Sequence, residues 1–155
     1  MAHFANLESQ TDPTGFTSDE HLIVVRVVVV GNDIPANGDT IEDNDMHTDG
    51  EIYCKNLFNG GMWKQTSFSN SFRKQFAGRG MVYDPTKDKF ISEQPYATWT
   101  LNDIDNWVAP ITYPNDVTDK NIVWDDTNQK WIATDNSDPV NNFDWNSSEL
   151  TWVSV

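Results

Sequence analysis

The sequence predicts a strand-dominated α+β fold: an N-terminal β-hairpin with one short helix, followed by a C-terminal series of β-hairpins with aromatic residues at both ends. Three observations predict this fold. β-Branched residues fill the apolar segment 22–30, which is typical of a central strand. The segment 51–60 places apolar residues at helical spacing. Aromatic residues then recur on either side of short polar runs, an arrangement that favours hairpins.

Two strands are predicted in the first 30 residues. The pieces "HFANL" (3–7) and "HLIVVRVVVV" (21–30) are interpreted as the neighbouring strands of one hairpin. A connector rich in Thr, Asp, Pro and Gly, residues 9–20, separates them. The next segment, residues 31–50, has six acids and no Lys or Arg, so we expect a long surface loop there.

One short helix is predicted at residues 51–60, "EIYCKNLFNG". The apolar side chains at helical spacing are Ile52, Tyr53 and Leu57. Asp49 is the predicted N-terminal cap, and Gly60 with Gly61 is the predicted stop. The following residues, 62–83, are punctuated by Ser, Asn and Gly. They predict a strand or an irregular segment that covers the core rather than a second helix.

A repeated phrase predicts four hairpins. The copies are "YDPTKDKF" (83–90), "LNDIDNW" (101–107), "WDDTNQKW" (124–131) and "WNSSELTW" (145–152). An Asp directly after the first aromatic residue can accept backbone N–H hydrogen bonds, which favours a compact turn. The first and third copies resemble the second hairpin of the immunoglobulin-binding domain of protein G in turn geometry alone. The side chains predicted to form structural aromatic pairs are Tyr83, Phe90, Trp107, Trp124, Trp131, Trp145 and Trp152.

The positions of these phrases suggest a division of the chain. We expect an N-terminal α+β core at residues 1–91 and a hairpin-repeat lobe at residues 92–155, with one continuous domain as the alternative. Prolines fall between the copies, where they end strands and block edge pairing. They are Pro95, Pro110, Pro114 and Pro139.

Charge is unevenly distributed along the chain. The formal net charge is −14, yet residues 51–90 hold seven Lys or Arg against three Asp or Glu. This basic stretch interleaves cations with aromatic rings and is the predicted interface, either with an acidic partner or with the acidic flank of a second copy. Its candidate residues are Trp63, Lys64, Phe72, Arg73, Lys74, Phe76 and Arg79. Stacking on nucleic acid, to which Phe68 would contribute, is disfavoured by the net charge.

The sequence offers no pattern of catalytic, cofactor or metal residues. Cys54 is the lone cysteine and lies on the predicted helix, where a buried thiol is expected. No "GxSxG" or phosphate-binding glycine loop occurs, so we expect no enzyme and no cofactor. No apolar run approaches the roughly 20 residues of a membrane span, and the first residues, "MAHFANLES", lack the pattern of a signal peptide.

Carboxylates are abundant, but they fall in predicted turns and are interpreted as solvated. The pairs are Asp43 with Asp45, Asp103 with Asp105, and Asp125 with Asp126. The acidic segment fails the helix-loop-helix calcium pattern because counting from Asp43 places Thr48 at the sixth position and Cys54 at the twelfth. No metal site is therefore assigned, although a weak, irregular Ca²⁺ site in residues 33–49 stays open.

Several phrases together resemble a family of short proteins encoded by tailed phages of marine bacteria, including cyanophages. They are "MAHFANL", "VVRVVVVGND", "IYCKNLF", "WKQTSFSNSFRKQFAGRGMVYD", "PYATWTLNDIDNWVAPITYP" and "VWDDTNQKW", in that order. The chain departs from the family at residues 9–20 and 33–49, which look longer, and in its final hairpin, which looks like an extra copy. The resemblance implies a virion component made in the host cytoplasm, with no catalytic residues attached.

Two functions follow from these observations. The first is a non-enzymatic structural protein of the phage particle, on the capsid exterior or associated with tail and fibres. It would contact other phage structural proteins and form a homo-oligomer, with no nucleic acid or membrane as partner. The alternative is a module that binds host-surface glycans on exposed tryptophans, drawn from Trp99, Trp107, Trp124, Trp131, Trp145 and Trp152. Burial of the rings discriminates between them.

Overall fold

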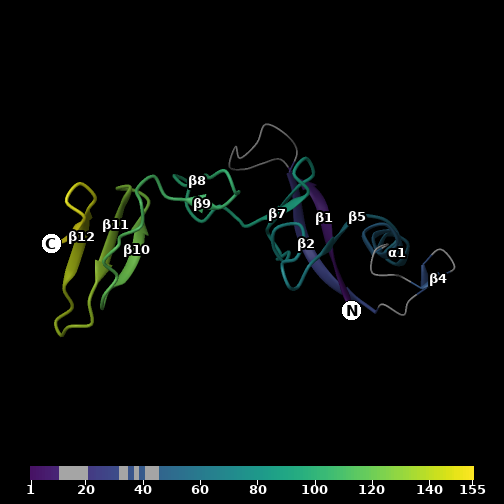
Figure 1. The fold of residues 1–155 in the computed structure, drawn as a ribbon, viewed down its shortest axis with the longest axis horizontal. Helices are drawn as coiled ribbons and strands as arrows, with labels where there is room; N and C mark the ends of the chain where they lie inside the picture. The colour runs from purple at the N-terminus through teal and green to yellow at the C-terminus, as the bar shows by residue number, and fades with distance from the viewer. Residues whose placement is uncertain (11–20, 32–34, 37–38, 41–45) are drawn as a thin grey trace. The chain divides into compact units, whose positions relative to one another are not determined.

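A computed structural model describes most of the chain. The described residues are 1–10, 21–31, 35–36, 39–40 and 46–155. They form two compact units, Met1–Glu93 (unit 1) and Gln94–Val155 (unit 2) (Figure 1). The predicted strand-dominated α+β fold is confirmed, since antiparallel sheets and one short α-helix make up the described residues.

Unit 1 contains a five-stranded antiparallel sheet of order β5-β1-β2-β6-β7. Its strands are β1 (Ala2–Gln10), β2 (His21–Val30), β5 (Met62–Thr66), β6 (Val82–Asp84) and β7 (Lys89–Ile91). The predicted N-terminal hairpin is confirmed, because β1 pairs with β2 from Ala2 opposite Val30 to Gln10 opposite His21. The predicted strand after the helix is β5, which pairs with the free side of β1.

A register shift between Asn6 and Leu7 changes which β2 side chains point to each face. Val28 packs with the cluster that contains Phe4, whereas Val24 packs on the opposite face with Leu7. Alternation alone would put Val24 and Val28 on one face, since both are even-numbered. The extra residue in β2 reverses the alternation, so both faces of the sheet receive apolar side chains.

Each face of the sheet has its own core cluster. The cluster on the helix side is Ala2, Phe4, Val30, Cys54 and Trp63. The cluster on the other face is Ala5, Leu7, Val24, Ala77, Tyr83 and Phe90. The irregular segment after β5 supplies Ala77 to the second cluster, which agrees with its predicted role of covering the core.

The helix α1 (Glu51–Leu57) follows a π-helical turn, η1 (Met46–Gly50). The predicted Asp49 cap is wrong: Gly50 occupies the N-cap position and no side chain caps it, because the chain enters α1 directly from η1. A Cβ at Gly50 would lie 2.2 Å from the ring of Phe4, so the close approach of helix and sheet requires glycine.

The predicted burial of Cys54 is confirmed, but the apolar residues at helical spacing are not all buried. Cys54 is the buried residue of the helix, whereas Ile52 and Leu57 are 39% and 54% exposed. The side of the helix that carries Cys54 packs on the sheet. The Phe4 ring of β1 lies against Gly50, and Phe4 and Cys54 belong to the same core cluster. The helix ends at Leu57, a little before the predicted glycine stop.

The segment predicted as a loop, 31–50, contains short elements as well. Two-residue strands β3 (Pro35–Ala36) and β4 (Asp39–Thr40) pair with each other. Residues 32–34, 37–38 and 41–45 lie outside the described residues, as do residues 11–20 of the predicted connector. Ser9 belongs to β1 instead of that connector.

Unit 2 contains a four-stranded antiparallel sheet in sequence order and a separate two-stranded sheet. The strands of the larger sheet are β10 (Asn121–Asp125), β11 (Lys130–Thr134), β12 (Asn142–Asn146) and β13 (Thr151–Ser154). Strands β8 (Thr100–Leu101) and β9 (Trp107–Val108) form the small one. The four repeats therefore belong to three sheets: the first to unit 1, the second to β8-β9, and the last two to the larger sheet of unit 2.

All four predicted hairpins are confirmed by register. The residues paired across the strands are Tyr83 with Phe90, Leu101 with Trp107, Trp124 with Trp131 and Trp145 with Trp152. The residue after the first of each pair accepts backbone N–H groups in the turn: Asp84, Asn102, Asp125 and Asn146. The residue two before the closing aromatic has positive φ in every copy: Asp88, Asp105, Gln129 and Leu150.

Candidate functional site

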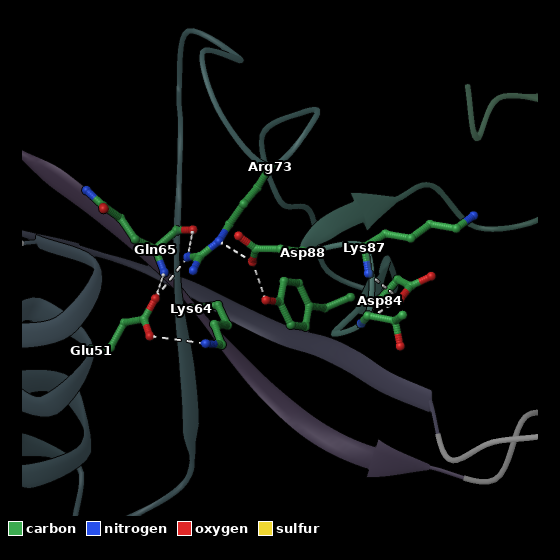
Figure 2. Close-up of polar contacts among 9 residues, drawn as sticks. Glu51, Lys64, Gln65, Arg73, Asp84, Lys87 and Asp88 are labelled. Carbon is green, nitrogen blue, oxygen red and sulfur yellow. Dashed lines mark hydrogen bonds and ion pairs between the residues drawn. The ribbon is translucent and has the colours of Figure 1, made fainter. Parts of the chain in front are cut away.

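Arg73 lies at the centre of a polar network in unit 1 (Figure 2). Its Nη1 donates to Glu51 Oε1 at 2.9 Å and to the carbonyl oxygen of Gln65 at 2.7 Å. Its Nε donates to Asp88 Oδ1 at 2.7 Å. The Arg73 side chain is 7% exposed and that of Glu51 is 16% exposed, so this contact is largely removed from solvent, whereas the Asp88 side chain is 58% exposed. The guanidinium thus connects α1, β5 and the turn between β6 and β7.

This network covers part of the outer edge of β5. The backbone N–H of Gln65 donates to Glu51 Oε1 at 2.9 Å, while its carbonyl accepts from Arg73. Lys64 Nζ lies 3.4 Å from Glu51 Oε2 and adds a second cation to the same carboxylate. Because β5 is the terminal strand of the sheet, its Gln65 backbone groups would otherwise be available to another strand. Side chains of the unit occupy that position instead.

Tyr83 and Asp88 complete the network on the far side of Arg73. The Tyr83 hydroxyl donates to Asp88 Oδ1, and the Tyr83 ring packs 5.2 Å from Phe90. Burial raises the pKa of Tyr83, and its hydrogen bond to Asp88 acts in the same direction. Burial opposes ionisation of Asp88, but the hydrogen bond from Tyr83 and the charge of Arg73 outweigh it and lower the Asp88 pKa.

Two of the predicted interface residues are internal to unit 1. Trp63 is 4% exposed, stacks on Phe58 at 4.8 Å and donates its indole N–H to the Gly60 carbonyl at 3.0 Å. Arg73 is buried in the network described above. Their spacing among cations in the sequence indicated a contact surface, but both residues are used to stabilise the unit.

The other predicted interface residues retain partial or full exposure. Lys64 pairs with Glu51 and is half-buried, and Arg79 is exposed. The remaining three, each half-buried, are Phe72, Lys74 and Phe76. Phe76 contacts His3 and Phe68, with ring centroids 5.3 and 5.5 Å away. Sequence reasoning missed His3 as a member of this cluster, because its partners lie more than 60 residues away along the chain.

The tryptophans of unit 2 form its core. Trp124, Trp131 and Trp145 are 4%, 5% and 7% exposed. The partly buried side chains packed against them are Tyr96, Trp99, Ala109, Ile111, Ile122 and Trp152. The paired rings cross at 5.0 Å in both the Trp124–Trp131 and Trp145–Trp152 hairpins. The predicted structural role of these pairs agrees with the geometry.

Indole N–H groups anchor the segment before β10 to this sheet. Trp131 donates to the Ile111 carbonyl at 2.9 Å, and Trp152 donates to the Asp116 carbonyl at 2.8 Å. The indole N–H groups of these two rings are therefore bound within unit 2. Trp107 is half-buried, on β9. Among the described residues no tryptophan has an exposed side chain.

Two of the carboxylates expected to be solvated differ from that expectation, one as a hydrogen-bond acceptor and one by burial. Asp126 accepts hydrogen bonds from the Thr98 hydroxyl and from Trp124 Nε1, the latter at 2.9 Å, and these bonds lower its pKa. Asp105 is 4% exposed, which corrects the expectation for the second pair. The hydrogen bonds of Asp125 to Asn128 lower the pKa of Asp125. The pair at residues 43–45 lies outside the described residues.

Cys54 is buried, and burial, with a smaller contribution from Glu51, raises the pKa of its thiol to about 11. A thiol with this pKa is protonated at neutral pH and is a poor nucleophile. Within the described residues no group of three or more His, Cys, Asp or Glu is placed to hold a metal ion. Most of the open calcium segment, 33–49, lies outside those residues.

No helix in the described part of the chain is long and apolar enough to cross a membrane. Comparison with protein-family models, curated proteins and solved structures found no match. The phage-family resemblance therefore stays a prediction.

Proposed function

We propose that the chain is a non-enzymatic structural component of the particle of a tailed marine phage, on the capsid exterior or associated with the tail and fibres. The observation that carries this proposal is the use of the aromatic side chains. In both units the predicted pairs lie inside packed hairpins, with Tyr83 and Phe90 in unit 1 and three tryptophans in unit 2 at most 7% exposed. Aromatic rings that pack inside small units stabilise those units, and stable small units are expected of a component of a durable assembly.

The charge distribution supports contacts between copies. Residues 94–155 carry ten Asp or Glu against two Lys, whereas residues 51–90 carry seven Lys or Arg against three acids. Two of those acids, Glu51 and Asp88, are bound to Arg73. The basic stretch of one copy, with Arg79 exposed, is thus complementary to the acidic unit 2 of another copy or to a different acidic phage protein. Nucleic acid and anionic membranes are disfavoured as partners by the net charge of −14.

The alternative, a glycan-binding module built on tryptophans, has less support. A stacking platform needs two or three accessible rings, and the described tryptophans are buried or half-buried. Four of the indole N–H groups also donate within the units, namely those of Trp63, Trp124, Trp131 and Trp152. A protein-contact role is therefore the better supported of the two functions.

Two measurements test this proposal. Mass spectrometry of purified particles of the encoding phage is expected to detect the chain, and light scattering of the purified protein is expected to detect an oligomer. Because the proposed contact is between exposed charges, the oligomer is expected to dissociate between about 0.05 M and 0.5 M salt. Absence from the particle together with a monomer at low salt would contradict the proposal.

A matched pair of variants locates the contact. Arg79→Glu changes the charge of the basic stretch and is expected to weaken the oligomer at low salt. Lys120→Glu makes the same change in net charge within the acidic unit and is expected to leave assembly intact. Equal effects of the two variants would show that net charge, rather than this contact, governs association.

A further inference from the structure

The ring of Phe68 stands out on the surface of unit 1. Its side chain is 75% exposed, more than any other aromatic side chain in the described residues; Tyr113 follows at 53%. The ring is nevertheless held in place, because it stacks on His3 at 5.7 Å and meets the edge of Phe76 at 5.5 Å. His3 and Phe76 also pack together at 5.3 Å. An exposed but fixed aromatic ring is a feature of ligand-contact surfaces.

Phe68 borders a hollow of about 660 Å³. The lining residues are Met1, His3, Gln65, Thr66, Ser67, Phe68, Ser69, Ser71 and Phe72. This volume lies within the range of roughly 300 to 1,000 Å³ that small-molecule sites occupy. The lining side chains are four hydroxyls, one amide, the Met1 thioether and three aromatic rings, one of which is the imidazole of His3, and none is Asp, Glu, Lys or Arg. The hollow thus combines a stacking surface with hydrogen-bonding groups that are mostly hydroxyls.

The hydroxyl groups are arranged by a turn that follows β5. Ser67 Oγ lies 2.8 Å from Ser71 Oγ and 3.2 Å from Ser69 Oγ, and it accepts the Ser71 backbone N–H at 3.0 Å. Asn70 has a φ of 58° at the tip, and its N–H donates to the Ser67 carbonyl at 3.0 Å. Each hydroxyl can both donate and accept, so a fixed cluster of them suits a ligand that carries hydroxyls of its own.

The chemistry of the lining selects a class of ligand. A phosphate, a carboxylate or a nucleic acid is most often bound by Lys or Arg, and neither is among the lining side chains. A purely apolar ligand would displace water from the serine hydroxyls without offering them hydrogen bonds in exchange. A sugar ring has an apolar C–H face that packs on an aromatic ring and hydroxyls that exchange hydrogen bonds with serines. We propose that the hollow beside Phe68 binds a neutral saccharide.

This site differs from the tryptophan platform considered above. It lies wholly in unit 1 and uses Phe68 with the serines of residues 67–71, so it does not rest on the proposed virion role. A protein partner that buries Phe68 is the competing occupant. The concave, hydroxyl-lined surface favours the saccharide, and the two occupants give different results in the test below.

The test is a nuclear magnetic resonance titration of the full chain with four neutral oligosaccharides: maltotetraose, cellotetraose, mannotetraose and N-acetylchitotetraose. At least one is expected to shift the backbone amide signals of residues 66–71. Phe68→Ala is expected to weaken that binding at least about tenfold while the rest of the spectrum is unchanged, since the ring is mostly exposed. Tyr113→Ala, which removes the next most exposed aromatic ring, is expected to leave the affinity unchanged.

Three results would overturn the proposal. The first is no shift at residues 66–71 with any of the four oligosaccharides. The second is binding that Phe68→Ala and Tyr113→Ala reduce equally. The third is stronger binding of a sulfated heparin oligosaccharide than of every neutral one, which would show an anion site. If Phe68→Ala dissociates an oligomer and no neutral sugar binds, Phe68 is a protein contact instead.

Discussion

At the residue scale, Arg73 contributes most to the organisation of unit 1. Its side chain binds Glu51, the Gln65 carbonyl and Asp88, and its own carbonyl accepts the N–H of Phe90 at 3.1 Å. Arg73 adopts a positive φ of 53°, which costs a non-glycine residue about 1–2 kcal/mol. The charged hydrogen bonds of the guanidinium offset this cost, so backbone conformation and network stabilise each other.

Removing the Arg73 side chain should therefore destabilise unit 1. Arg73→Ala leaves Glu51 and Asp88 without their main cation and retains the unfavourable φ. The free energy of unfolding is expected to fall by about 3 kcal/mol. Urea denaturation, monitored by hydrogen exchange of the β1 and β5 amides, measures this loss of stability. Arg79→Ala, at an exposed position, is the control and is expected to change stability by less than about 0.5 kcal/mol. Equal stability of the two variants would contradict the role of Arg73.

Because of Tyr83, the free energy of unfolding of unit 1 depends on pH in the alkaline range. The folded pKa of Tyr83 is raised above the ordinary value of about 10, so the fold favours the protonated hydroxyl. This contribution is fully present below about pH 10 and declines above it, by at most about 1.4 kcal/mol per pH unit, as the unfolded tyrosine ionises. The charged groups near the hydroxyl, Asp88, Arg73 and Lys64, are retained in Tyr83→Phe.

Comparison of the two proteins isolates this titration. Between about pH 9 and pH 11 the free energy of unfolding is expected to decline less steeply in Tyr83→Phe than in the natural chain, because one linked proton is removed. Chemical denaturation at several pH values provides the slopes. Parallel slopes would mean that the Tyr83 hydroxyl ionises equally readily in the folded and unfolded states.

At the element scale, the four hairpins share a turn that their sequence phrase encodes locally. An Asp or Asn accepts turn N–H groups, and a residue with positive φ stands two positions before the closing aromatic. The copies were recognisable because these requirements act within eight residues. Three copies place Asp or Gln at the positive-φ position, whereas the last places Leu150, which is 60% exposed.

Leu150 therefore adopts a positive φ that is unfavourable for leucine, although the rest of the turn has the hydrogen bonds of the other copies. Leu150→Asn is expected to raise the free energy of unfolding of unit 2 by about 1 kcal/mol, since asparagine adopts positive φ more readily than leucine. Thermal denaturation monitored by tryptophan circular dichroism provides the measurement. Val140→Asn replaces another exposed apolar residue, 54% exposed, and φ is not positive there. A similar change in both variants would refute the conformational explanation.

The helix illustrates the limit of local patterns. Burial of Cys54 was predicted correctly, yet Ile52 and Leu57, which have helical spacing, are exposed. The choice of face depends on Phe4, which lies against Gly50 and is distant in sequence. The same limit applied to the candidate site: Trp63 and Arg73 were predicted on a surface, because the contacts of the arginine with Glu51 and Asp88 are not evident from the sequence.

At the scale of the whole molecule, unit 2 contains the parts of its own core. The three most buried tryptophans and the side chains packed on them all lie within Gln94–Val155. We therefore expect a fragment of residues 94–155 to fold alone. Its near-ultraviolet circular dichroism should retain the tryptophan signal, and the signal should be lost cooperatively on heating. The same fragment with Trp131→Ala is the control, expected to lose that signal. A fragment without a cooperative transition would refute this expectation.

The sequence alone determined which segments form strands, hairpins and a helix, because turn chemistry, aromatic spacing and β-branched runs act over a few neighbouring residues. Only the tertiary structure decided which faces are buried and which residues meet. It placed the hairpins in three sheets, turned Arg73 inward and left Phe68 exposed beside hydroxyls. These outcomes depend on contacts between residues far apart in the chain, whose energies no local pattern contains.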